Sequence, residues 1–138
     1  MARILSLDYG GKRTGIAVTD PNQIIASGLT TVETPKLVSF LKEYLQREKV
    51  ELVLIGMPLN WDETDTHSTQ LVRNFIIVFK KTFPEMQIKE IDERYTSKMA
   101  SQAMLEMGLN KKHRKSKTTI DEVAATIMLQ DYLQSTNI

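Results

Sequence analysis

The chain has 138 residues, of which 41% are hydrophobic and 25% charged, and its formal net charge at pH 7 is +1. That length fits one domain of about 100–150 residues, and that composition is typical of a globular protein rather than a disordered chain. The absence of Cys excludes disulfides, thiolate nucleophiles and Cys-ligated zinc, and two His make a His-rich metal site unexpected. Any metal ion would be held by carboxylates, which points to Mg²⁺ or Mn²⁺.

The sequence holds no targeting or linker signal. No run of about 18 apolar residues is present, so no membrane span and no membrane partner are expected. The N-terminal stretch is too soon interrupted by Asp8 to be a signal peptide, which favours a soluble cytoplasmic protein. Without repeats, low-complexity tracts or Pro/Gly-rich linkers, residues 1–138 are expected to form a single domain.

The first part of the chain predicts three strands. Residues 3–9 form an apolar run that ends at Gly10-Gly11, residues 14–20 lead into the turn signal Asp20-Pro21-Asn22, and residues 24–33 are rich in Ile, Thr and Val. The short connections between them favour an antiparallel meander.

The hydrophobic period then changes to that of helices. Thr34-Pro35 predicts an N-cap followed by Pro at the first helical position. Residues 52–56 are a short continuous apolar run, typical of a strand that is buried on both faces. The helix before this strand is expected to bury Leu37, Leu41, Tyr44 and Leu45. The helix after it is expected to bury Leu71, Phe75, Val78 and Phe79.

The last third predicts one strand, residues 87–92, and two helices. The first helix would begin at Thr96 or Ser97 and end at Gly108. Thr119 and Glu122 can form a capping box for the final helix, whose buried side would hold Ile120, Val123, Ala124 and Ile127. The order βββαβαβαα predicts an α/β fold: a five-stranded mixed sheet with helices on both faces, in which residues 3–9 pair with residues 52–56.

Two acidic positions end apolar strands. Asp8 would be desolvated in the middle of the sheet unless paired or bound to metal, or it merely caps the following turn. Asp92 and Glu93 stand at the end of the strand predicted for residues 87–92. Adjacent strand residues point to opposite faces, so only one of these two acids can face the side of Asp8. A solvent-facing strand end paired with Arg94 is an equally good interpretation of this second segment.

A third acid, Asp121, lies in the first turn of the last helix, where it could simply favour the helix dipole. Ala125 and Met128 share its side of the helix, however, so that side is not purely polar. Strand carboxyl ends are where open α/β sheets place their sites, so the three acids are expected to converge. Converging carboxylates repel one another unless cations lie between them, and two Mg²⁺ about 3.5–4 Å apart would catalyse phosphodiester hydrolysis.

Four segments, in order along the chain, carry a family pattern. Asp8–Ala17 resembles D-x-G-x-K-R-x-G-[VI]-A and Gly56–Asn60 resembles G-[LM]-P-L-N. Asp92–Ser97 resembles D-E-R-[LY]-[ST]-[ST], and residues 120–133 resemble D-x-x-A-A…L-Q-x-Y-L. Over nearly its whole length, the chain thus resembles the YqgF family, also called RuvX, of the ribonuclease H-like superfamily.

The resemblance implies a ribonuclease H-like fold and a metal-dependent nuclease whose catalytic acids, and ligands of Mg²⁺ or Mn²⁺, are Asp8, Glu93 and Asp121. The family is linked to maturation of the 5′ end of 16S rRNA, and it has also been assigned to Holliday junction resolution through its similarity to the RuvC resolvases. The chain departs from the family at residues 62–65 and 117–119, where Gly is usual, which leaves the geometry of the substrate open.

Basic and hydroxyl side chains near the three acids are candidates for binding phosphates. They are Lys12, Arg13, Arg94, Thr96, Ser97, Lys111, Lys112, Arg114 and Lys115. The basic run at 111–117 is interpreted equally well as a solvated loop between two helices.

Several alternatives stay open at this point. The nucleic-acid partner is precursor rRNA or, as the alternative, branched DNA, and the protein is a monomer or a weak homodimer. The segment from Asp8 to Gly15 also resembles the phosphate loop of actin-like and sugar-kinase ATPases, but those need two such domains. A nucleic-acid-binding protein without catalysis would gain nothing from three carboxylates that repel phosphate.

Overall fold

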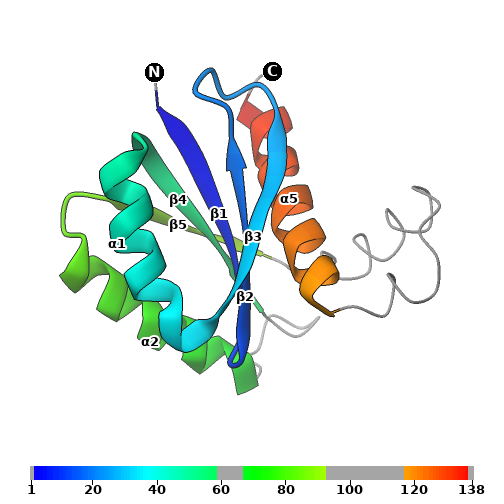
Figure 1. The fold of residues 1–138 in the computed structure, drawn as a ribbon. Helices are drawn as coiled ribbons and strands as arrows, with labels where there is room; N and C mark the ends of the chain where they lie inside the picture. The colour runs from blue at the N-terminus through cyan, green and yellow to red at the C-terminus, as the bar shows by residue number, and fades with distance from the viewer. Residues whose placement is uncertain (1, 59–66, 93–116, 137–138) are drawn as a thin grey trace.

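Five strands form one mixed sheet in the computed structural model, which describes residues 2–58, 67–92 and 117–136 (Figure 1). The strands are β1 (Arg3–Tyr9), β2 (Arg13–Thr19), β3 (Ala26–Glu33), β4 (Val50–Met57) and β5 (Gln87–Asp92). Their spatial order is β3-β2-β1-β4-β5. β1 pairs antiparallel with β2 and parallel with β4, so β1 lies in the middle of the sheet, as the sequence predicted.

The turn between β2 and β3 explains why β3 begins two residues later than predicted. The carboxylate of Asp20 accepts hydrogen bonds from the backbone N–H groups of Ile24 and Ile25, at 2.8 and 2.7 Å, and of Asn22, at 3.1 Å. Gln23 takes the left-handed conformation within this turn, with φ 58°. These bonds, the one from Ile25 first, lower the pKa of the Asp20 carboxyl.

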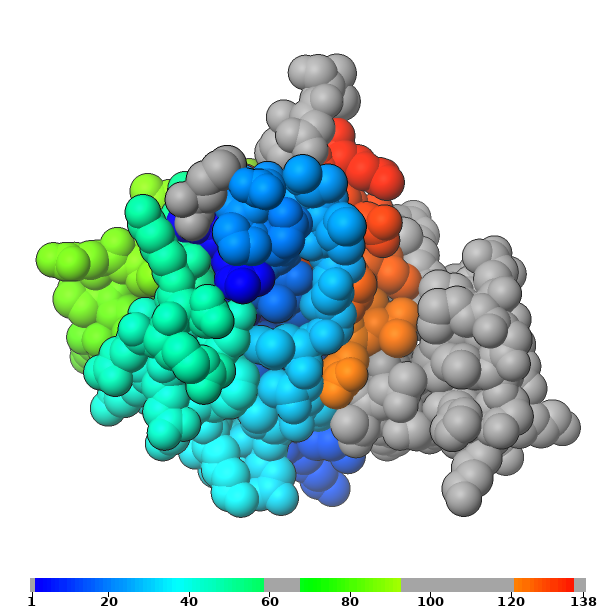
Figure 2. All heavy atoms as spheres, turned by 45° about the horizontal axis from the view of Figure 1, so that its top comes forward, coloured from blue at the N-terminus to red at the C-terminus, as the bar shows by residue number. Residues whose placement is uncertain are grey.

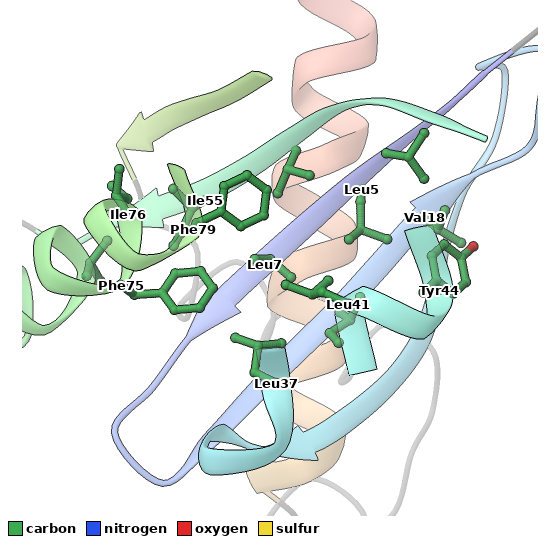
Figure 3. Close-up of a cluster of buried hydrophobic side chains, with 14 of the residues drawn as sticks. Leu5, Leu7, Val18, Leu37, Leu41, Tyr44, Ile55, Phe75, Ile76 and Phe79 are labelled. Atoms are coloured by element: carbon green, nitrogen blue, oxygen red, sulfur yellow. The ribbon is translucent and has the colours of Figure 1, made fainter. Parts of the chain in front are cut away.

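One face of the sheet is covered by α1 (Leu37–Arg47) and α2 (His67–Thr82) (Figure 1). Figure 3 shows Leu5 and Leu7 of β1 pointing into this layer, between Leu41 of α1 and Phe79 of α2. The predicted buried side of α1 is confirmed, with Leu45 only partly buried. Its buried residues are Leu37, Leu41 and Tyr44.

The predicted buried side of α2 was wrong at two of its four positions. Leu71 and Val78 are 46% and 47% exposed, whereas Val72 and Ile76 are buried beside Phe75. Residues 71–79 are apolar on two neighbouring sides of the helix, so periodicity alone does not decide which side packs. The side that packs is decided by the sheet, because Val72, Phe75, Ile76 and Phe79 share one buried cluster with Leu7 and Ile55.

Thr34 does not cap the first helix as predicted. A 3₁₀ turn, η1 (Thr34–Lys36), precedes α1, and its N-cap is Glu33. The hydroxyl of Thr34 instead donates to the carbonyl oxygen of Gly10 at 2.5 Å, and its backbone N–H donates to the carbonyl oxygen of Lys12 at 3.0 Å. Thr34 therefore holds the turn between β1 and β2.

The opposite face of the sheet is covered by α5 (Lys117–Thr136), which packs against β2, β3 and β1 (Figures 1 and 2). This helix begins two residues before Thr119, so the predicted capping box was wrong. Of its predicted buried side, Ala124 is confirmed as buried, whereas Val123 and Ile127 are only partly buried. The buried residues are Ala124, Ala125, Met128, Leu129 and Leu133, on the side of Asp121.

The helix predicted to follow Thr96 or Ser97 and the basic run at 111–116 lie outside the described residues. Among the described helices, none is long and apolar enough to cross a membrane.

Candidate active site

Asp8 lies on the face of the sheet that α5 covers. Ile4 packs in the cluster beneath α5, and Leu7 packs in the cluster beneath α1 and α2. Side chains alternate along a strand, so Asp8 shares the face of Ile4. It is only partly buried, near the carboxyl end of β1, where the parallel strands β4 and β5 also end. This edge is where the sequence placed the site.

Gly15 brings the start of α5 to Asp8. Gly15 of β2 is the direct antiparallel partner of Asp8 of β1, and such partners have Cα atoms about 4.5–5.5 Å apart. A Cβ on Gly15 would lie 2.8 Å from the backbone nitrogen of Glu122, and closer still to the carbonyl group of Asp121. The backbone of Asp121 thus rests on the strand residue that is paired with Asp8.

Arg13 contacts Asp121 directly. Its Nε donates to Oδ2 of Asp121 at 3.3 Å, although the two residues are 108 positions apart in the sequence. Both side chains are partly exposed, Arg13 by 36% and Asp121 by 24%. Arg13 has the same strand parity as Gly15, so its side chain belongs to the α5 face. The sequence singled out Arg13 as a phosphate ligand but gave no sign of this contact.

A second contact fixes the same turn of α5. The hydroxyl of Thr31, the β3 partner of Gly15, donates to Oε1 of Glu122 at 3.1 Å. On β3, a Cβ on Gly28 would meet the Thr126 hydroxyl at 3.5 Å, an ordinary contact. The start of α5 is therefore held on β2 and β3 by two side-chain contacts, from Arg13 to Asp121 and from Thr31 to Glu122, and neither was predicted from the sequence.

The end of β5 separates Asp92 from Asp8. Ile88 packs with the cluster beneath α1 and α2, whereas Ile91 packs with the cluster beneath α5. By alternation, Asp92 belongs to the side of Ile88, opposite to the side of Asp8. Glu93 lies outside the described residues.

The donor set at this edge fits a hard divalent cation. Asp8 and Asp121 offer carboxylate oxygens, the ligands that Mg²⁺ and Mn²⁺ prefer, and Gly15 leaves room for them to approach each other. Within residues 2–58, 68–92 and 121–135, no three His, Asp or Glu side chains gather into a metal-binding group. The predicted third ligand, Glu93, lies outside these ranges.

Of the predicted phosphate ligands, Lys12 and Arg13 are described. Lys12 is exposed in the turn between β1 and β2, at the same edge of the sheet, and Thr34 holds that turn. The remaining ones lie outside the described residues: Arg94, Thr96, Ser97, Lys111, Lys112, Arg114 and Lys115.

A groove of about 380 Å³ opens beside the end of β5, between this strand and α5. Asp92 and Asp131 line it, and the Lys89 ammonium lies 5.0 Å from the centre of the Tyr132 ring. The side chains of Lys89 and Asp131 give this groove one positive and one negative charge, in contrast to the basic turn at Lys12.

Comparison with known proteins gives the family. Residues 2–135 match the family described as "RuvX: Holliday junction resolvase". The chain belongs to the RuvX family. The chain is also similar to proteins named "Putative pre-16S rRNA nuclease" from Flavobacterium johnsoniae, 57% identical over 98% of each chain, and from Bacteroides thetaiotaomicron, 47% identical over 98% of each chain.

Solved structures agree on the fold of this RuvX protein. Thermus thermophilus RuvC, solved in complex with a Holliday junction substrate, superposes with a TM-score of 0.59 at 13% identity, over 99% of this chain and 98% of that one. The fowlpox virus resolvase, solved with Holliday junction DNA, gives a TM-score of 0.55 at 13% identity, over 99% of each chain. Together with the observed sheet order, these likenesses confirm the predicted ribonuclease H-like fold.

Proposed function

We propose that residues 1–138 form one metal-dependent nuclease domain, which hydrolyses phosphodiester bonds in the precursor of 16S rRNA. The observation that carries the proposal is the close approach of Asp121 to Gly15, the strand partner of Asp8. Relatives 46–57% identical to the chain are named for this substrate, which supports the choice of RNA.

Asp8, Asp121 and Glu93 would hold Mg²⁺ or Mn²⁺. Asp92 belongs to the face of β5 opposite to Asp8, so Glu93, which lies outside the described residues, is kept as the proposed ligand of that acidic pair. A divalent ion held there supplies Lewis-acid stabilisation of the phosphate and lowers the pKa of a bound water. The three carboxylates position that chemistry at the carboxyl edge of the sheet.

The substrate would approach over the turn between β1 and β2. Lys12 and Arg13 carry positive charge there, and phosphate contacts in nucleic-acid complexes are made mostly by such side chains. Basic and hydroxyl residues outside the described ranges complete the proposed binding surface: Arg94, Thr96, Ser97, Lys111, Lys112, Arg114 and Lys115.

A second candidate substrate is a four-way DNA junction, because the family description names Holliday junction resolution. Symmetric cleavage of a junction requires a two-fold dimer. A monomer or weak homodimer, the state expected from the sequence, favours RNA. The cytoplasmic location stays a prediction, and it fits a substrate that is a precursor of the ribosome.

Cleavage of two substrates side by side tests the proposal. Purified full-length protein with Mg²⁺ or Mn²⁺ is incubated with a 5′-extended 16S rRNA fragment and with a four-way DNA junction of similar length. We expect metal-dependent cleavage of the RNA in the 5′ extension. Symmetric cleavage of the junction alone would replace RNA by branched DNA as the substrate, and no metal-dependent cleavage of either would refute the nuclease function.

A further inference from the structure

Arg13 stands out among the proposed phosphate ligands because it contacts a proposed metal ligand. Its guanidinium lies at the start of β2, where the chain is paired with Glu33 of β3, and its Nε donates to Oδ2 of Asp121 at 3.3 Å. One of its five N–H donors is engaged by a carboxylate of the protein, so the guanidinium has a partner on the protein before any phosphate arrives. Its position therefore points to a role at Asp121.

We propose that Arg13 is a positioning residue of the metal site, a role that rests on the nuclease function proposed above. Its guanidinium orients the Asp121 carboxylate beside Asp8, so that a divalent ion meets oxygen ligands that are already in place. Metal ligands are commonly oriented by such hydrogen-bond partners, and removal of a partner typically weakens metal binding by about 10–100-fold.

The backbone contact at Gly15 cannot do this alone. It fixes where the main chain of Asp121 lies, but the side-chain torsions still decide where the carboxylate points. A charge-assisted hydrogen bond restricts those torsions, and the positive charge offsets the repulsion between the Asp8 and Asp121 carboxylates. The planar guanidinium of Arg gives a direction that the ammonium of Lys does not.

The solvent exposure of the Arg13–Asp121 ion pair indicates that the pair orients the Asp121 carboxylate rather than stabilising the fold. Both side chains are in contact with solvent, 36% for Arg13 and 24% for Asp121, and ion pairs of this kind contribute little to folding. An ion pair that adds little stability yet joins a strand to a proposed metal ligand is better explained by what it does to that ligand.

The neighbouring hydrogen bond provides a matched control. Thr31 holds Glu122 at 3.1 Å, in the same turn of α5 and at a similar distance, but Glu122 is not a proposed ligand. If Arg13 were only a tether for the helix, removal of either side chain would have the same effect on metal binding. The proposal requires different effects.

The experiment compares four variants of the full-length protein: Arg13→Gln, Arg13→Lys, Thr31→Val and Lys12→Gln. Mn²⁺ affinity is measured from the electron paramagnetic resonance signal of the unbound ion, with no RNA present. Binding of single-stranded RNA is then measured against salt concentration, without metal. Circular dichroism establishes that each variant is folded at the temperature used.

We expect Arg13→Gln to weaken Mn²⁺ binding about 10–100-fold and Arg13→Lys to restore part of it. Thr31→Val and Lys12→Gln should change Mn²⁺ affinity less than about twofold. The log–log salt slope of RNA binding should fall by about 0.7 for Lys12→Gln, which binds one phosphate fewer, and stay unchanged for Arg13→Gln.

Two results would overturn the role of Arg13 while wild-type Mn²⁺ binding and cleavage remain intact. One is unchanged or stronger Mn²⁺ binding in Arg13→Gln with a flattened salt slope, which would make Arg13 a phosphate ligand. The other is an equal loss of Mn²⁺ affinity in Thr31→Val, which would make the ion pair a simple tether. Absence of Mn²⁺ binding to the folded wild-type protein would instead refute the proposed function, and the role of Arg13 with it.

Discussion

Substitution of Gly15 by Ala tests the close approach that brings Asp121 to Asp8. The added Cβ would meet backbone atoms of Asp121 and Glu122, at 2.8 Å for the nitrogen of Glu122, and backbone atoms cannot rotate away as a flexible side chain can. The start of α5 must therefore move off β2, and the Asp121 carboxylate must move with it.

The expected loss of stability follows from two opposing effects. Overpacking of this kind costs about 1–3 kcal/mol, and replacing Gly by Ala in a strand returns about 0.5–1 kcal/mol through the entropy of the unfolded chain. We expect the free energy of unfolding to fall by about 1–2 kcal/mol. Displacement of a metal ligand by about 1 Å is expected to lower the cleavage rate about 100-fold.

Gly28→Ala is the matched control, because this glycine also faces α5 from a neighbouring strand. Its added Cβ would lie 3.5 Å from the Thr126 hydroxyl, an ordinary contact, so stability should stay unchanged or rise slightly. Urea denaturation gives the free energies, and cleavage at saturating Mg²⁺ gives the rates. Equal stability and equal activity of the Gly15 and Gly28 variants would refute the close approach of α5 to β2.

Three further predictions concern other parts of the chain. Ser6 is fully buried and its hydroxyl has no hydrogen-bond partner within the described structure, so Ser6→Ala should raise the free energy of unfolding by about 1 kcal/mol; a clear loss in urea denaturation would show that the hydroxyl is bonded. The backbone hydrogen bonds to Asp20 lower its pKa below the ordinary value of 3.8, so they stabilise the fold above that pH and lose their effect as pH falls through the folded-state pKa. The stability difference between wild type and Asp20→Asn should accordingly shrink on acidification, and a constant difference from pH 5 to pH 2 would contradict this. Alanine at Lys111, Lys112, Arg114 and Lys115 should weaken RNA binding and lower the log–log salt slope by about 0.7 for each phosphate that is no longer bound, whereas an unchanged slope would identify a solvated loop.

Sheet topology could be predicted because the strands carry strong local signals. The strands Arg3–Tyr9 and Val50–Met57 are rich in apolar residues and are buried over most of their length, as central strands are, and the short connections before Glu33 favour a meander. The acids Asp8 and Asp121 could be singled out because a carboxylate among apolar residues has a cost that needs a reason.

The details that sequence reasoning missed all depend on contacts between distant segments. Leu71 and Val72 are both apolar, and only the placement of α2 on the sheet buries one and exposes the other. The sequence around Thr34 predicts that its hydroxyl caps the following helix, but in the structure this hydroxyl donates to the carbonyl oxygen of Gly10. The pairing of Arg13 with Asp121 could not be predicted, because no sequence pattern near either residue distinguishes an arginine that binds a carboxylate from one that binds a phosphate.

The most direct test of the metal-dependent nuclease site is Mn²⁺ affinity, measured together with cleavage of the 5′-extended 16S rRNA fragment, for Asp8→Asn and Asp121→Asn. The amide keeps the size of each side chain and removes the charge that would hold the metal. Asp131→Asn, on the exposed side of α5 near its other end, is the control. Loss of Mn²⁺ binding and of cleavage in the first two variants, with both retained in the control, is the predicted result. Wild-type Mn²⁺ affinity and cleavage in either Asp8→Asn or Asp121→Asn would contradict a metal site shared by these two carboxylates.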